Sequence, residues 1–140
     1  MDIKDNKIHK IISSKYNLLF LFIIVTLFFI FQHFKSVSWD FMAYSLNAKY
    51  FFRNFSYFEW VSPPLTPFLI SLFSVFTWKI AEYGYIVFVS SLHLFSCVCL
   101  SKKLEFNPTY FYVLSISPFL LFDGLFVGTE LLALSLLQLM

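Results

Sequence analysis

Acidic side chains beside hydrophobic segments are the residues of this chain best placed to carry chemistry. Asp40 follows closely on the first hydrophobic segment, Glu59 lies in the polar stretch after it, and Glu130 stands at the start of the last segment. Lys49 and Arg53 lie between the first two acids. Carboxylates can transfer protons in catalysis, and ionisable groups kept beside a membrane are costly and commonly functional. The pattern therefore predicts a polar site at the edge of a membrane.

The composition predicts an all-α, polytopic integral membrane protein. Hydrophobic residues make up 59% of the 140 residues and charged residues 13%, whereas an average soluble domain carries about 25% charge. The chain contains 21 phenylalanines, which suits contact with lipid and with the interfacial region. The net charge of +2 is small and no basic run with interleaved aromatic residues occurs, so we expect no nucleic-acid partner.

Basic residues before the first hydrophobic segment set the expected orientation. Lys4, Lys7, Lys10 and Lys15 precede an uncharged run, so the positive-inside rule places the N-terminus in the cytoplasm. No small-residue cleavage site follows the run, which favours a retained span over a signal peptide. In a plasma membrane or its equivalent we expect about four spans plus interfacial helices: a basic cytoplasmic tail (1–16), a span (17–34), an outer loop with the interfacial helices (35–82), two spans (83–101 and 108–123) and a truncated span (129–140).

The last expected span is too short to cross a membrane. Residues 130–140 are mostly apolar and contain neither a cap nor a polar tail, whereas a spanning helix needs about 20 residues. We therefore expect the chain to be the N-terminal piece of a longer membrane protein.

The stretch from Pro64 to Ile80 can be interpreted in two ways. It is apolar enough to cross the membrane, or it lies in the interface with Trp60 and Trp78 near its ends. Crossing would place Lys102 and its neighbouring lysine outside, so the positive-inside rule favours the interfacial interpretation. With that interpretation, five acids gather on the outer side of the membrane: Asp40, Glu59, Glu82, Asp123 and Glu130.

The outer loop is predicted to begin with a helix over residues 40–54. Ser38 can cap this helix, and the helix dipole favours Asp40 in its first turn. Helical pitch then places two polar groups on nearly opposite sides: Asp40, Asn47 and Asn54 on one, and Ser45, Lys49 and Arg53 on the other.

The cysteines and histidines predict neither a metal site nor a cofactor site. Cys97 and Cys99 point about 200° apart on a helix, so we expect two buried free thiols. His33 and His93 stand alone in apolar surroundings and are expected to pack rather than to bind a ligand. The chain has no cluster with metal-ligand spacing and no glycine-rich phosphate loop.

The order of several short motifs resembles one family of membrane enzymes. A basic N-terminus and one span are followed by the run WDFMAYSLNA at 39–48 and the run SPPLTPFL at 62–69. Next come a span that ends in basic residues, a span that contains Pro118, and the run GTEL at 128–131. This order resembles the N-terminal part of the GT-C glycosyltransferases, in the branch that includes dolichyl-phosphate-mannose protein mannosyltransferases and aminoarabinose lipid A transferases.

The resemblance implies a polytopic enzyme that transfers a sugar on the outer face of the membrane. The donor would be a polyprenyl-phosphate-linked sugar, and the acceptor a protein or a lipid. Asp40 would be the general base that accepts the proton of the acceptor hydroxyl while the sugar inverts. Glu59 and Glu130 would shape the acceptor site or support the base. By itself, the fragment is expected to lack the later helices that bind the carrier and to be inactive.

One position departs from the family pattern. The family usually carries a basic residue before the Pro-Pro pair, and Ser62 occupies that place here. A cation should stabilise the charge that develops on the leaving phosphate. Lys49, Arg53 and Lys79 are the local candidates, and the sequence leaves the choice among them open.

Two other functions fit the same pattern. The chain could be a small non-catalytic membrane subunit whose outer loop binds a partner. A transporter piece whose outer loop binds a partner is equivalent to this alternative. The second alternative is a flippase or polymerase that handles the same lipid-linked sugars without this transfer. The subunit hypothesis predicts that Asp40 can be replaced without loss of function, whereas the enzyme hypothesis predicts loss.

Overall fold

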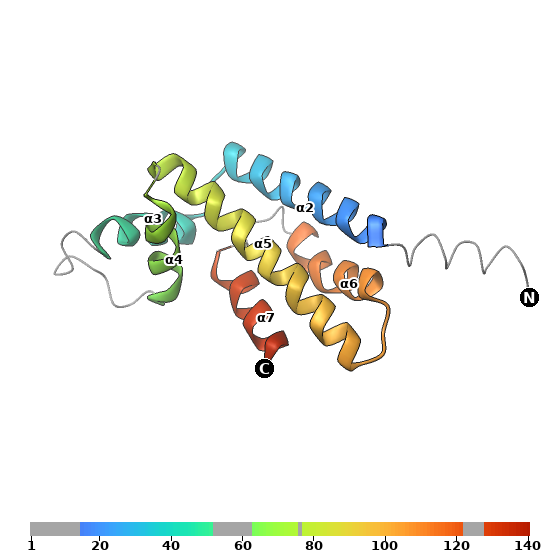
Figure 1. Cartoon of the computed structure of the whole chain (residues 1–140). Helices are drawn as coiled ribbons and strands as arrows, with labels where there is room; N and C mark the ends of the chain where they lie inside the picture. The colour runs from blue at the N-terminus through green and yellow to red at the C-terminus, as the bar shows by residue number, and fades with distance from the viewer. Residues whose placement is uncertain (1–14, 52–62, 76, 122–127) are drawn as a thin grey trace, which may run out of the picture.

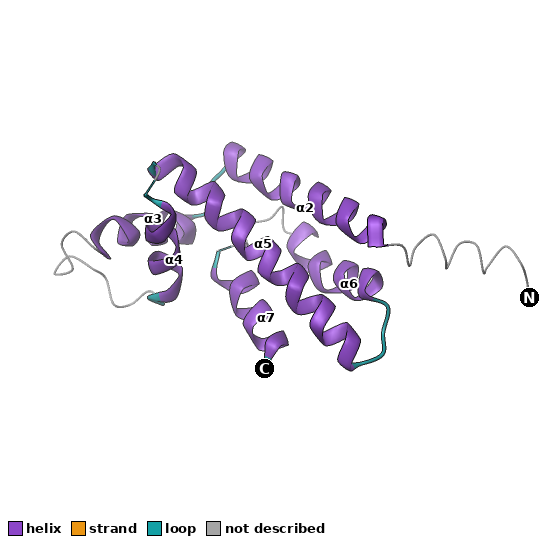
Figure 2. Ribbon diagram, in the orientation of Figure 1, coloured by secondary structure: helices purple, strands orange, loops and turns teal. Residues whose placement is uncertain are grey.

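A computed structural model describes residues 15–51, 63–75, 77–121 and 128–140. Every regular element within these ranges is an α-helix (Figure 2), which confirms the predicted all-α class for them. The helices are α2 (Lys15–Lys35), α3 (Trp39–Phe51), α4 (Leu65–Phe73), α5 (Trp78–Lys103), α6 (Pro108–Leu121) and α7 (Thr129–Leu139).

The central helix of the molecule is α5, which packs against α2, α4, α6 and α7. The chain direction of α2 is opposite to that of α5. Helix α6 packs beside both α2 and α5, whereas α7 lies on the other side of α5 from α2 (Figure 1). Helices α3 and α4 pack on each other and lie where α5 begins (Figure 1). We call this end of the bundle the α3 end, and we call the end where α5 reaches Lys102 and Lys103 the lysine end.

Large side chains from four helices share one core. Phe29 of α2, Tyr85 of α5, Ile116 of α6 and Leu131 of α7 are all buried. In a bilayer, lipid is as apolar as these side chains, so close packing and hydrogen bonds between helices hold such a bundle together.

Two helices are long and apolar enough to cross a membrane, namely α2 over Tyr16–Lys35 and α5 over Trp78–Lys103. Their 20 and 26 residues correspond to lengths of about 30 and 39 Å. The hydrocarbon core of a bilayer is about 30 Å thick. Helix α6 has 14 residues and α7 has 11, so both are shorter than the hydrocarbon core is thick. The expectation of about four spans therefore stays a prediction.

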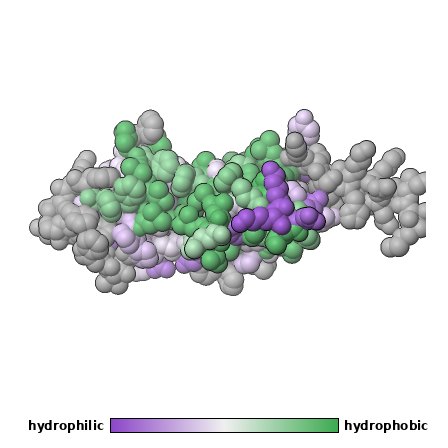
Figure 3. Space-filling model, turned by 60° about the horizontal axis from the view of Figure 1, so that its bottom comes forward, coloured by the Kyte–Doolittle hydropathy of each residue, from purple (hydrophilic) through white to green (hydrophobic). Residues whose placement is uncertain are grey.

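Most of the apolar surface of α2 lies outside the helix bundle. Only 17% of its most apolar window is buried, compared with 44% for α5. Its exposed side chains include Phe20, Leu27, Phe31 and Phe34. On the face drawn in Figure 3, apolar residues cover most of the described surface, and the strongly hydrophilic ones form one compact group. Such a surface suits contact with lipid, because water-exposed apolar patches of this extent are unusual on soluble monomers.

The stretch from Pro64 to Ile80 is divided between two helices and is not one interfacial helix. The backbone of Thr77 is extended (φ −156°, ψ 157°), and its hydroxyl accepts a hydrogen bond from the Ile80 N–H at 3.2 Å. This N-cap starts a new helix, so Trp78 begins α5 and does not end the preceding element. With 9 residues, α4 is about 14 Å long and too short to cross a bilayer.

Candidate functional site

Asp40 lies in the first turn of α3, shortly after α2 ends. The hydroxyl of Ser38 accepts a hydrogen bond from the Phe41 N–H at 3.2 Å, and its carbonyl accepts one from the Met42 N–H at 3.0 Å. These bonds make Ser38 the N-cap of α3, as the sequence predicts. The Asp40 side chain is exposed, so its carboxylate is accessible to a ligand.

The start of α7 packs on the same part of α3. The hydroxyl oxygens of Tyr44 and Thr129 are 3.4 Å apart, and Thr129 donates a hydrogen bond to the Glu130 carboxylate at 3.2 Å. Gly128 is next to the Tyr44 ring, since an added Cβ would be 3.7 Å from it, an ordinary van der Waals contact. Because Asp40 precedes Tyr44 by one helical turn, the two share a side of α3. The segments that carry Asp40 and Glu130 therefore meet at the α3 end.

Tyr85 of α5 contacts each of the segments that meet at the α3 end. Its hydroxyl donates a hydrogen bond to the carbonyl of Gly128 at 2.6 Å and lies 3.4 Å from the hydroxyl oxygen of Thr66 on α4. Its ring packs against the ring of Phe41 on α3, with 5.8 Å between the centroids. One buried tyrosine therefore links α3, α4 and the start of α7 to the central helix.

A third acid at the α3 end, Glu82, is paired with a histidine. Nε2 of His33 lies 3.0 Å from Oε2 of Glu82, which joins the end of α2 to the beginning of α5. The His33 ring is held edge-on by Phe41 at 4.6 Å and by Tyr83 at 5.5 Å between centroids. Glu82 is therefore committed to a contact between helices, unlike the exposed Asp40.

Lys49 lies on the side of α3 opposite to Asp40, because nine residues amount to two and a half helical turns. Its Nζ is 5.9 Å from the centroid of the Trp78 ring, within the range of a cation–π interaction. The structure therefore brings Lys49 to the beginning of α5 and not to the Asp40 carboxylate.

Two predicted substrate-binding residues, Glu59 and Arg53, lie outside the described residues. The same holds for Asp123, the remaining member of the predicted group of outer acids, and for the helical extension to Asn54. Their roles stay predictions.

Sequence reasoning missed the contacts that assemble the α3 end. His33 and Glu82 are 49 positions apart, and no local pattern links them. The Tyr44–Thr129 contact spans 85 positions. Tyr44 does carry one signal that sequence reasoning could have used, because it follows Asp40 by one turn on a predicted helix.

A second polar group is buried in the middle of α5. His93 is fully buried, with its Nε2 2.9 Å from the Ser115 hydroxyl of α6 and its Nδ1 3.3 Å from the Ser135 hydroxyl of α7. Ser96 donates a hydrogen bond to the side-chain carbonyl of Gln138 at 2.7 Å. The His93 cluster, as we call it, consists of His93, Ser96, Cys97, Ser115, Ser135 and Gln138. It joins three helices, and it confirms that His93 packs within the protein.

The two serines beside the His93 ring also bond to backbone. Ser115 donates to the Tyr112 carbonyl at 3.1 Å, and Ser135 donates to the Leu131 carbonyl at 2.6 Å. A neutral imidazole has one donor and one acceptor nitrogen. The acceptor nitrogen therefore takes a hydrogen either from a serine that turns its hydroxyl away from the carbonyl or, at Nε2, from the Cys97 thiol, whose sulfur is 3.5 Å away.

Both cysteines are free thiols, as predicted. Cys97 is buried and Cys99 partly so, and the Cys97 sulfur lies 3.2 Å from the Ser115 hydroxyl oxygen. Within the described parts of the chain, no three His, Cys, Asp or Glu side chains come together in a way that could hold a metal ion.

Comparisons with protein-family models, with curated proteins and with solved structures found no match to this chain.

Proposed function

We propose that the chain is the N-terminal part of a membrane glycosyltransferase that uses a polyprenyl-phosphate-linked sugar. The observation that supports the proposal best is the placement of Asp40, an exposed carboxylate in the first turn of a helix that directly follows an apolar helix of spanning length. The start of α7, which carries Glu130, packs beside it through Tyr44 and Thr129. Two carboxylates at one end of a bundle can serve one acceptor site.

The proposed reaction is an inverting transfer to a hydroxyl of a protein or lipid acceptor. The acceptor hydroxyl gives its proton to the Asp40 carboxylate while its oxygen forms a bond to the anomeric carbon. The bond between that carbon and the carrier phosphate breaks, and the phosphate oxygen keeps the electron pair. A cation stabilises this charge. Because Lys49 lies at Trp78 and on the side of α3 opposite to Asp40, we assign that role to Arg53, with Glu59 beside the acceptor.

We further propose that the α3 end lies at the outer face and that the chain crosses the membrane several times, with its N-terminus in the cytoplasm. Glu82 and Lys102 lie in the same helix 20 residues apart, or about 30 Å, which matches the hydrocarbon thickness of a bilayer. Six basic residues precede α2 or stand at its start, or end α5, and four lie in the sequence between them, an excess that suits the positive-inside rule: Lys4, Lys7, Lys10, Lys15, Lys102 and Lys103 against Lys35, Lys49, Arg53 and Lys79. Labelling of single cysteines introduced at Asp40 and Lys102 from either side of sealed membrane vesicles tests this orientation.

The enzyme hypothesis is tested by a transfer assay in membranes that contain the protein in its natural form. With a radiolabelled polyprenyl-phosphate sugar as donor, we expect Asp40→Asn to lower the transfer rate about 10²- to 10⁴-fold, the usual contribution of a general base. Glu105→Gln is the matched control, because it removes an exposed carboxylate in the loop after α5. Wild-type transfer by the Asp40→Asn protein would overturn the proposal and favour a non-catalytic subunit or a flippase piece.

A further inference from the structure

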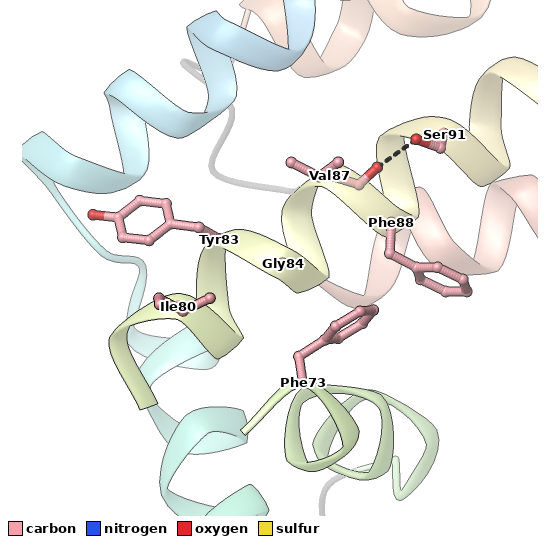
Figure 4. Close-up of a pocket in the computed structure, with 7 residues that line it drawn as sticks. All are labelled: Phe73, Ile80, Tyr83, Gly84, Val87, Phe88 and Ser91. Carbon is pink, nitrogen blue, oxygen red and sulfur yellow. Dashed lines mark hydrogen bonds between the residues drawn. The ribbon is translucent and has the colours of Figure 1, made fainter. Parts of the chain in front are cut away.

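An apolar groove of about 530 Å³ lies on the surface of α5. Phe73 of α4 forms one wall, and Tyr83, Val87 and Phe88 of α5 contribute to the rest (Figure 4). The rings of Phe73 and Phe88 lie 5.8 Å apart between centroids. The groove therefore lies where α4 meets a helix of spanning length.

The wall formed by Phe73 depends on a glycine. At Gly84, an added Cβ would lie 3.2 Å from Cδ1 of Phe73, which is closer than ordinary contact. The hydroxyl of Ser91, at the far end of the groove, donates to the Val87 carbonyl at 2.7 Å (Figure 4). Its hydrogen is therefore used within the helix, and the groove keeps an apolar lining.

The length of the groove matches one leaflet of a bilayer. Its lining on α5 extends from Ile80 to Ser91, a rise of about 16 Å. One leaflet contributes about 15 Å to the hydrocarbon core. A chain that fills the groove therefore begins at headgroup depth and ends near the midplane of the membrane.

A cation stands at the headgroup end of the groove. Lys79 is exposed and precedes Tyr83 by four residues, so the two are neighbours on the surface of α5. A lysine at this depth extends its ammonium group toward the headgroups. Glu82 does not face the groove, because it is bonded to His33 of α2. The groove therefore combines an apolar lining with a positive charge at its headgroup end.

We propose that the groove binds one glycerophospholipid with a net negative headgroup, with an acyl chain along α5 and the phosphate beside Lys79. The leaflet length of the groove favours an acyl chain over a polyprenyl chain, which is several times longer. The proposal does not rest on the glycosyltransferase hypothesis, since it needs only a membrane-inserted α5. It assigns Lys79 to a membrane phospholipid and not to the sugar donor.

Native mass spectrometry of the purified protein in nanodiscs of mixed phosphatidylglycerol and phosphatidylcholine tests the groove. We expect one phosphatidylglycerol to stay bound per chain. Val87→Trp fills the groove and should lower this occupancy about ten-fold. This is the effect expected when about two methylene groups of the acyl chain can no longer be buried in the groove. Val113→Trp is the matched control, because Val87 and Val113 are both 42% exposed and Val113 lies on α6. Equal lipid loss in both variants would overturn the proposal, provided that circular dichroism shows both to be helical.

The charge of Lys79 is tested separately. Lys79→Gln should reduce the preference for phosphatidylglycerol over phosphatidylcholine about five-fold, since one lysine near a membrane surface has roughly that effect. Lys102→Gln, at the lysine end of α5, should leave the preference unchanged. A preference that survives Lys79→Gln, or displacement of the bound phospholipid by equimolar polyprenyl phosphate, would contradict the assignment.

Discussion

The α3 end and the His93 cluster are two polar regions within the described residues, and their polar groups have different surroundings. At the α3 end, Asp40 and Glu130 are exposed, and side chains such as Tyr85 and His33 hold the helices that carry them. In the His93 cluster, the polar atoms bond to one another between α5, α6 and α7. The first arrangement leaves carboxylates accessible to a ligand, whereas the second uses its hydrogen bonds to fix how helices pack.

This comparison predicts that the two histidines differ in their contribution to stability. His93→Ala should lower the free energy of unfolding most, by about 3 kcal/mol, because it opens a cavity and removes the partner of Ser115 and Ser135. Denaturant unfolding in micelles, followed by far-ultraviolet circular dichroism, measures this change. Phe95→Ala on the same helix is the control, since the Phe95 side chain is exposed to the outside of the bundle. Similar losses in the two variants would show that the cluster contributes no specific stability.

His33→Ala should have a smaller effect, about 1 kcal/mol. The pair with Glu82 is partly exposed, with 9% and 30% of the two side chains accessible, and partly exposed ion pairs contribute little. Glu82→Gln keeps a hydrogen bond to His33 and should cost less than His33→Ala. The same unfolding measurement ranks these variants. If His33→Ala lowered the free energy of unfolding more than His93→Ala does, the predicted difference between the two histidines would be wrong.

Asp40→Asn should change stability least, by less than about 0.5 kcal/mol, as is usual for exposed substitutions away from buried networks. The carboxylate is exposed, and the Ser38 cap of α3 does not involve it. A small change in the free energy of unfolding together with a large loss of transfer rate would show that Asp40 serves function and not folding. An unfolding loss comparable to that of His33→Ala would indicate a structural role for Asp40 instead.

The sequence was sufficient to predict the helical class and the start of α3. Ser38 is a cap residue directly before a helical pattern, and the cap is found where this local rule puts it. The start of α5 was predicted at 83, too late in the chain. Thr77 carries the same kind of cap signal, but the apolar residues on both sides of it suggested one continuous helix.

The faces of the helices could not be predicted from the sequence. α2, α5 and α6 are apolar nearly all round, so the periodicity that normally marks a buried side is weak. His93 appeared as a lone histidine because Ser115 and Ser135 follow it by 22 and 42 positions. Contacts of this kind depend on how each helix is rotated against its neighbours, and short motifs carry no information on that rotation.

The His93 cluster also has a consequence for the order in which the helices could enter a membrane. The chain is synthesised from its N-terminus, so α5 is complete before α6 and α7 exist. Until those helices arrive, His93, Ser96 and Cys97 lack the partners that Ser115, Ser135 and Gln138 provide. Polar groups without partners are costly in hydrocarbon. In a membrane, stable insertion of α5 would therefore be coupled to the synthesis of the two helices that follow it.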